Sequence, residues 1–220
     1  MDFDQLIWNF FAEYAYKPHL VYGGVIAFMT MSSFGLPLPE EVVLVCAGIV
    51  AFMALNPSEF PPPTPGAEGV DLFVLAIVCL VSVILSDFFI YMIGRLLGEK
   101  ILKSKMFQKE AAQKRLKKIE VWFNKYGSWA CGIFRFTPGI RFPGHLSCGA
   151  MKVPIWKFLL IDGGAALISV PTQVILVATY GEVIVSELKR FKLIVIGACL
   201  LLAAIYFAYQ FFLNRRGSKI

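Results

Sequence analysis

Long apolar stretches alternate with short polar ones along the chain, and three of them are long enough to cross a membrane. They cover residues 72–97, 156–185 and 190–214. A helix needs about 20 mainly apolar residues to span the hydrocarbon core of a bilayer. The pattern therefore predicts an all-helical integral membrane protein with three transmembrane helices. In the first of them, Gly94 and Gly98 have a spacing that favours close packing against another helix.

Two further apolar regions, residues 20–55 and 128–153, are each interrupted in the middle by proline and glycine. These residues end or kink helices, and the arms on either side are short for a membrane span. Irregular backbone at membrane depth is tolerated only where protein or a wet cavity covers it. We therefore expect two re-entrant helical hairpins that face each other, as in an inverted repeat. The expected turn residues are Pro37, Pro39, Pro138, Gly139, Pro143 and Gly144.

Two other segments, residues 1–19 and 100–126, carry apolar residues at helical spacing among polar ones. The first is too short to span, so an interfacial amphipathic helix is expected there. The second is rich in lysine and is expected to lie on the anionic leaflet of the membrane. An ordinary solvated helix packed on the protein is equally compatible with the same pattern.

The uneven distribution of lysine and arginine predicts the orientation. The proline-rich connector 56–71 contains neither residue, whereas the segment 100–126 and the C-terminal end are rich in them. Because cytoplasmic loops carry the excess of positive charge, the connector is expected outside and the other two inside. Lys189, Arg190 and Lys192 do not fit this order.

Composition supports the membrane assignment and argues against other classes. Of the 220 residues, 58% are hydrophobic and 16% charged, and the mean hydropathy is +0.69, which is too apolar for a soluble domain. The net charge of +6 comes from lysines and arginines that are unevenly distributed along the chain. This distribution indicates membrane topology first, before binding to nucleic acid. The five cysteines form no CxxC pair and read as buried free thiols, so neither a metal nor a cofactor is expected. The sequence also contains no catalytic motif that would indicate an enzyme.

Arg135 and Arg141 lie among apolar residues, where an unpaired cation is costly. On an unbroken helix they would point away from each other, but Pro138 and Gly139 between them allow both to turn toward one site. A guanidinium group suits phosphate or carboxylate, so the pair is a candidate anion clamp. The alternative is that both arginines reach the interface or pair with internal acids.

The candidate acidic partners are Glu40, Glu41 and Asp87. The first two also fit a simpler explanation, since acids in the first turn of a helix complement its positive end. Asp87 lies inside an apolar stretch and is expected to meet one of the two arginines rather than Arg95. Asp162 and His145 are interpreted as packing or structural residues.

Three groups of residues then form a distinctive combination. They are Pro37-x-Pro39-x-Glu41 with Ala47-Gly48, Ser86-Asp87 with Tyr91-x-x-Gly94-Arg95-x-x-Gly98, and Phe134-Arg135-x-x-Pro138-x-x-Arg141 with Gly149. Over residues 20–185 this combination resembles the DedA family, also called the SNARE-associated Golgi or VTT-domain family. The Arg-x-x-Pro-x-x-Arg element is its most specific part.

The resemblance implies a polytopic membrane protein with two opposed re-entrant loops. Bacterial members are linked to returning undecaprenyl phosphate across the cytoplasmic membrane in dependence on the proton motive force, and eukaryotic relatives to phospholipid scrambling. The resemblance assigns function to Arg135, to Arg141 and to Glu41 or its neighbour Glu40. Many members carry a further acid where this chain has Met31-Ser32-Ser33.

We therefore expect a transporter of undecaprenyl phosphate or a related lipid phosphate in the bacterial cytoplasmic membrane. Arg135 and Arg141 would bind the phosphate, and Glu40, Glu41 and Asp87 would exchange protons or compete for the arginines. The alternatives are a proton-coupled antiporter of small cations or drugs, whose acids bind the substrate, and a phospholipid scramblase. The expected partners are membrane lipids and no nucleic acid, and the sequence permits a homodimer.

Overall fold

The computed structural model describes residues 3–33, 40–102, 110–137, 140–181 and 183, and this part of the chain is helical without a strand. Contacts divide the chain into Met1–Thr179 and Tyr180–Ile220. The predicted all-helical fold is confirmed for the described residues, whereas the predicted helix 190–214 lies outside them. In chain order the helices are α1 (Phe3–Tyr14), α2 (Pro18–Ser33), α3 (Glu40–Leu55), α4 (Leu72–Leu102), α5 (Glu110–Tyr126), the short 3-10 helix η1 (Gly127–Trp129), α6 (Ala130–Arg135), α7 (Arg141–Ala150) and α8 (Ile155–Thr179).

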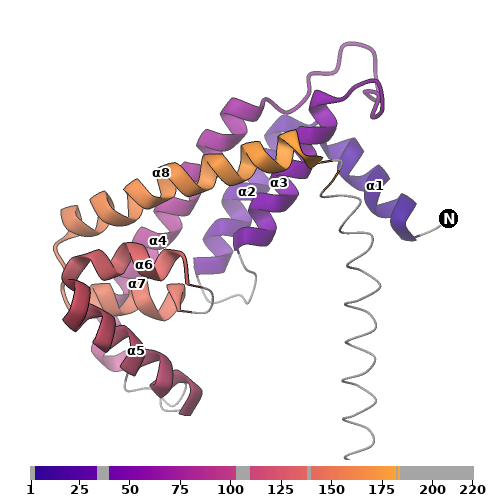
Figure 1. Cartoon of the computed structure of the whole chain (residues 1–220). Helices are drawn as coiled ribbons and strands as arrows, with labels where there is room; N and C mark the ends of the chain where they lie inside the picture. The colour runs from indigo at the N-terminus through magenta and orange to yellow at the C-terminus, as the bar shows by residue number, and fades with distance from the viewer. Residues whose placement is uncertain (1–2, 34–39, 103–109, 138–139, 182, 184–220) are drawn as a thin grey trace, which may run out of the picture. The chain divides into compact units, whose positions relative to one another are not determined.

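Helices α4 and α8 are the two long helices of the described structure (Figure 1). Their segments Leu72–Gly98 and Ile155–Thr179 are long and apolar enough to cross a membrane. Only 44% and 28% of their most apolar windows are buried inside the protein. Large apolar side chains such as Phe73 and Ile168 therefore face outward. A surface of this kind is favourable against lipid but not against water. By length and composition these helices match two of the three predicted spans.

Helix α4 packs against α7 at backbone contact, because glycine leaves no side chain between them. A Cβ atom added at Gly94 would lie 2.0 Å from the carbonyl oxygen of Leu146, and one at Gly98 would lie 2.5 Å from the Cβ of Ala150. From the other side, a Cβ at Gly149 would lie 2.0 Å from the carbonyl oxygen of Tyr91. The predicted use of Gly94 and Gly98 for close helix packing is thus confirmed.

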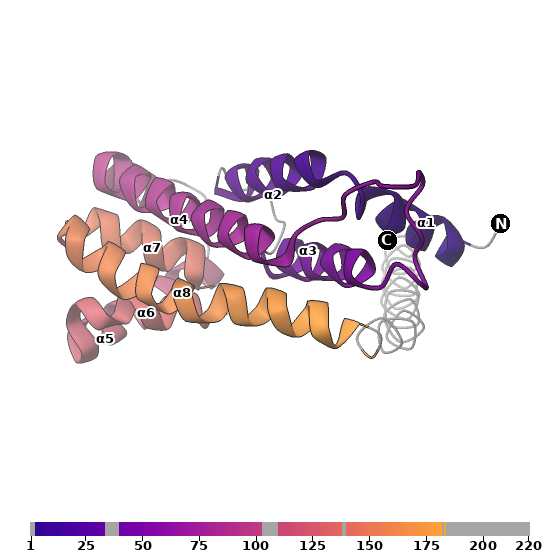
Figure 2. The same cartoon turned by 90° about the horizontal axis from the view of Figure 1, so that it is seen from above.

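The short helices α6 and α7 lie side by side in both views (Figures 1 and 2) and contact each other. Pro143 and Gly144 lie inside α7, which corrects their assignment to the turn. Proline is tolerated there because the first N–H groups of a helix have no partner within it. Gly144 makes room for Phe134 of α6, whose ring would lie 2.6 Å from an added Cβ. The other four expected turn residues (Pro37, Pro39, Pro138 and Gly139) lie outside the described residues.

Helix α5 turns its apolar side to the protein. Ile119 and Phe123 are buried in a cluster with Phe134, and the ring of Trp122 stacks on Phe134 with 5.8 Å between centroids. The described lysines of α5 remain exposed. The helix begins at Glu110 rather than near residue 100, because α4 continues to Leu102. The geometry therefore favours the packed helix over one whose apolar face lies in lipid.

Candidate functional site: a buried cluster of charged residues

Asp87 of α4 is fully buried and lies at the centre of a cluster of charged side chains. Arg135 donates a hydrogen bond to its Oδ2 at 2.7 Å, and Arg141 donates to both of its carboxylate oxygens at 2.7 Å. The expected contact of Asp87 with an arginine is therefore present, and it involves both. Two guanidinium groups that converge on one carboxylate show that a single anionic group can bridge them.

Arg135, at the C-terminal end of α6, is the more buried of the two arginines. Besides Asp87 it donates to Asp162 Oδ1 at 3.1 Å and to Ser169 Oγ at 3.3 Å. Its Nη2 has no hydrogen-bond partner among the described residues and lies 3.9 Å from Glu40 Oε1. A buried guanidinium nitrogen without an acceptor is unfavourable, so this atom can take a further anionic oxygen.

Arg141, the first residue of α7, forms an ion pair with Glu40, the first residue of α3. Their side chains are 15% and 11% exposed, whereas those of Asp87 and Asp162 are 0% and 2% exposed. This ion pair therefore forms the more accessible edge of the cluster. The neighbouring Glu41, which the resemblance favoured, is exposed and has no ion pair with either arginine in the described structure. Of the two predicted acids, Glu40 is the one that the fold brings to the arginines.

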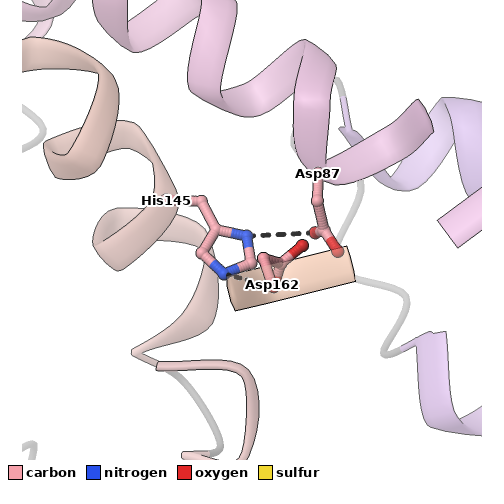
Figure 3. Close-up of side chains that lie close together, drawn as sticks. All are labelled: Asp87, His145 and Asp162. Carbon is pink, nitrogen blue, oxygen red and sulfur yellow. Dashed lines mark hydrogen bonds and ion pairs between the residues drawn. The ribbon is translucent and has the colours of Figure 1, made fainter. Parts of the chain in front are cut away.

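His145 of α7 and Asp162 of α8, which were expected to be packing or structural residues, complete the cluster. His145 Nδ1 lies 3.1 Å from Asp87 Oδ1, and its Nε2 lies 3.3 Å from Asp162 Oδ1. Figure 3 shows both carboxylates beside the imidazole ring, Asp87 at Nδ1 and Asp162 near Nε2. Both signals were present in the sequence: Asp162 interrupts an apolar stretch as Asp87 does, and His145 follows Arg141 by about one helical turn.

The helix packing explains why these residues meet. The glycine contacts hold α7 against α4, so that Arg141 and His145, on one side of α7, reach Asp87. Further along, Tyr91 donates to the carbonyl oxygen of Val153 at 2.5 Å, and Arg95 donates to the same carbonyl at 3.2 Å. Arg95 thus fixes the segment between α7 and α8 and takes no part in the charged cluster, as expected.

The cluster contains residue types that bind metals, since ligand atoms of Asp87, His145 and Asp162 lie within 4.8 Å of one another. Both carboxylates, however, already accept hydrogen bonds from Arg135, and Asp87 accepts two more from Arg141. A divalent cation would lie beside two permanent positive charges. The donor set therefore favours protons and exchangeable anions over a metal ion.

Comparisons with known proteins identify the family. The VTT domain matches residues 38–182. An uncharacterized membrane protein of Haemophilus influenzae is 31% identical over 169 residues, which cover 76% of this chain and 71% of the relative. An uncharacterized membrane protein of Mycobacterium tuberculosis is 30% identical over 155 residues, covering 67% and 64%.

A more distant relative is undecaprenyl phosphate transporter A of Staphylococcus aureus, 23% identical over 164 residues that cover 72% of this chain and 70% of the relative. No solved structure matches the chain significantly. The matched region contains every residue of the charged cluster. The chain is thus a member of the VTT-domain, or DedA, family of membrane proteins.

Proposed function

We propose that the protein is a multi-pass transporter that moves a lipid phosphate of the undecaprenyl phosphate type across the bacterial cytoplasmic membrane. The observation that carries the proposal is the geometry of the arginine pair. Arg135 and Arg141 converge on one carboxylate, and the Nη2 of Arg135, which makes no hydrogen bond among the described residues, lies 3.9 Å from the partly exposed Glu40. A phosphate group has enough oxygens to replace Glu40 at Arg141 and to satisfy this nitrogen at once.

A shallow apolar hollow beside the arginines supports a lipid as the ligand. It has a volume of about 370 Å³ and is lined by Phe136, which follows α6, and by residues of α8 that include Ile168, Ser169 and Leu176. Ser169 accepts the hydrogen bond from Arg135 Nε, so the hollow begins next to the clamp. A hydrocarbon chain that enters it would leave its phosphate within reach of the guanidinium groups.

We further propose that α2–α3 and α6–α7 are re-entrant hairpins that carry the clamp and its competing acid. Glu40 begins α3 and Arg141 begins α7, so the cluster joins the N-terminal ends of the two second arms. The relative named as an undecaprenyl phosphate transporter supports the substrate class. The proton motive force would drive the exchange of the phosphate for the acids.

The test is the accessibility of undecaprenyl phosphate on the outer leaflet of bacterial cells with and without this protein. If the protein returns the lipid inward, its loss should raise the amount that an external, membrane-impermeant ligand of lipid phosphates can bind. A variant with Arg141→Gln, expressed at the same level, should behave like the loss of the protein. Equal accessibility in all three cell lines would overturn the proposed function.

The same cluster favours one second candidate, a proton-coupled antiporter of cations. The cluster holds three acids, Glu40, Asp87 and Asp162, but two arginines, so one negative charge is left that a transported monovalent cation or a proton could neutralise. In that case the lipid assay would give no difference, whereas cells without the protein would lose resistance to a transported cation. This alternative leaves the apolar hollow and the Nη2 of Arg135, which makes no hydrogen bond among the described residues, without a ligand.

A further inference from the structure

Cys131 of α6 and Cys148 of α7 place their thiol groups against each other where the two helices pack. Both are free cysteines, both are 0% exposed, and their Sγ atoms lie 2.7 Å apart. Non-bonded carbon atoms pack at about 3.5–4.0 Å, and sulfur is larger than carbon. A disulfide bond joins two sulfur atoms at about 2.05 Å. The two sulfur atoms are therefore closer than ordinary packing allows, and they need little movement to bond.

The surroundings of the two sulfur atoms suit the oxidised form. Cys131 and Cys148 belong to one buried cluster with the aromatic rings of Tyr91, Phe134 and Phe158. A thiol is a weak donor and a weak acceptor, so the contact between the two thiols gains little from hydrogen bonding. A disulfide carries no S–H group into this cluster and removes the crowding between the sulfur atoms. The fold thus provides both the short distance and the apolar environment that a disulfide needs.

The helices that carry the two cysteines also carry the arginine pair. Cys131 precedes Arg135 by four residues in α6, and Cys148 follows Arg141 by seven residues in α7. At these spacings each cysteine lies on the same side of its helix as the arginine. The two helices have only six and ten residues, and helices this short are marginal unless the rest of the fold supports them. A bond between the cysteines would therefore hold together the two supports of the arginine pair.

We infer that Cys131 and Cys148 are a disulfide-forming pair, and that their oxidation joins α6 to α7 without displacing Arg135 and Arg141. The oxidant is a small uncharged peroxide, because a larger or charged reagent cannot reach sulfur atoms that have no exposed surface. This inference goes beyond the proposed function and does not depend on it.

The reaction takes two steps, and hydrogen peroxide represents the oxidant. The sulfur of one thiol attacks the O–O bond, which gives a sulfenic acid and one molecule of water. The sulfur of the second thiol then attacks the sulfenic sulfur, the S–S bond forms, and the hydroxyl group leaves with the remaining thiol proton as a second molecule of water. Two thiols are thereby oxidised to one disulfide, and one peroxide is reduced to two molecules of water.

The bond is tested in full-length protein in detergent, with Cys46, Cys79 and Cys199 replaced by alanine so that only the pair remains. The protein is treated with hydrogen peroxide, the peroxide is destroyed with catalase, and the protein is then unfolded in sodium dodecyl sulfate and labelled with a maleimide. We expect two labels without the treatment, none after it, and two again when the unfolded protein is first reduced. Mass spectrometry should find a peptide of α6 linked to a peptide of α7.

The matched controls are Cys131→Ala and Cys148→Ala, since each leaves one buried thiol without its partner. Each should keep its single label after the same treatment. An exposed reference, Lys117→Cys in a chain without other cysteines, shows by loss of its label that the peroxide was active. If the pair keeps both labels under conditions that consume the reference, the inference is overturned. A disulfide between two protein molecules, in place of one within the molecule, would also overturn it.

The effect of the bond on α6 and α7 is measured on the same protein. The cross-link closes a loop that spans 17 positions of the sequence and constrains the unfolded chain, so the oxidised form should melt at least about 5 °C above the reduced form. The sulfur atoms approach each other by only about 0.7 Å. Both forms should therefore bind farnesyl phosphate in mixed micelles with the same affinity.

A lower melting temperature of the oxidised form, or loss of binding in that form alone, would show that the bond displaces the helices and would overturn the inference. If neither form binds farnesyl phosphate, the proposed function fails, while the labelling and melting results still decide whether the disulfide forms.

Discussion

Glu40 and Glu41 are adjacent in sequence but lie in different surroundings, which makes them a matched pair for an experiment. Glu40 pairs with Arg141 and lies 3.9 Å from Arg135 Nη2, whereas Glu41 is exposed. Glu40→Gln removes the charge that competes for the arginines and preserves the size of the side chain. We expect it to lower lipid-phosphate transport at least tenfold, and Glu41→Gln to leave transport within about twofold of wild type.

The measurement is the outer-leaflet accessibility of undecaprenyl phosphate in cells that express each variant at the same level. Purified Glu40→Gln should also bind a lipid phosphate at least as tightly as wild type, because the competitor is gone while both arginines remain. Slow transport combined with undiminished binding would identify Glu40 as the group that releases the ligand. If Glu41→Gln proves the more damaging change, the cluster described here is not the transport site.

The two arginines should respond differently to replacement by lysine. Lysine keeps the positive charge but offers a point charge in place of a planar fork. Arg141 lies at the accessible edge, so Arg141→Lys should fold normally and lose about tenfold in affinity for a lipid phosphate. Arg135 donates to the buried Asp87 and Asp162 and to the half-buried Ser169, so Arg135→Lys should also lower the yield of folded protein. Binding assays on both purified variants measure the affinity, and size-exclusion profiles measure the yield of folded protein. Normal binding by both variants would show that the arginines have a structural role and do not bind the phosphate.

The sequence allowed part of this site to be predicted for a physical reason. Arg135, Arg141 and Asp87 are charges inside apolar stretches, and such charges must find partners in a membrane protein. His145 was not selected because a histidine is compatible with both packing and chemistry until its neighbours are known. Glu40 and Glu41 could not be told apart from the sequence. Adjacent side chains on a helix point about 100° apart, and the turn before the helix decides which of the two faces the arginines.

At the level of elements, the contact between α4 and α7 is the one on which the cluster depends most directly. A methyl group at Gly94 would lie 2.0 Å from the Leu146 carbonyl oxygen, and backbone cannot move away as a flexible side chain can. Gly94→Ala should therefore force the helices apart and destabilise the protein by about 1–3 kcal/mol or more. It should also weaken lipid-phosphate binding, because Arg141 and His145 would move away from Asp87.

Gly164 of α8 provides the matched control, because a Cβ added there meets no atom within 4 Å. Gly164→Ala should leave the apparent melting temperature in detergent unchanged or slightly raised, since alanine is the better helix former. The comparison of the two melting curves isolates the close contact from the general effect of replacing a glycine. Equal stability of the two variants would show that α4 and α7 are not packed at backbone distance.

The apolar pattern predicted helices better than it predicted their ends. The stretch 72–97 corresponds to α4, which continues to Leu102. The end was not predicted because the residues after position 97 are compatible with both a helix and a loop. Pro143 was read as a turn residue, yet it occupies the first turn of α7, where its missing N–H costs nothing. Periodicity shows which residues share a face, but only packing shows whether that face meets lipid or protein, as α5 illustrates.

On the scale of the whole molecule, one backbone hydrogen bond and two tyrosine hydroxyls join the N-terminal helices to the proline-rich connector 56–71. Val70 donates to the carbonyl oxygen of Ala15 at 2.8 Å, and Tyr16 donates to that of Phe60 at 2.6 Å. The backbone N–H of Asp71 donates to the hydroxyl of Tyr22 at 3.2 Å. The junction of α1 and α2 must therefore lie on the same side of the membrane as the connector, which charge alone did not reveal.

Helix α4 leads from this connector toward α5, and its apolar part is long enough to cross the bilayer. The connector contains no lysine or arginine, whereas α5 is strongly basic, so the connector should be outside and α5 in the cytoplasm. Three exposed positions report this order: Ser58 in the connector, His19 at the start of α2 and Lys117 on α5. Each is changed to cysteine, as Ser58→Cys, His19→Cys or Lys117→Cys, in a chain whose own cysteines are replaced by alanine.

A membrane-impermeant maleimide added to intact cells should label the first two variants and spare the third, which should react only after the cells are opened. His19→Cys is the decisive variant. The nearby Lys17 does not predict an outside location for His19, so only the hydrogen bonds to the connector place His19 outside. If Ser58→Cys reacts from outside and His19→Cys does not, the connector is not bound to α1 and α2 in the membrane. If Lys117→Cys reacts from outside, the orientation is reversed and the direction of proton-driven transport proposed for the cluster reverses with it.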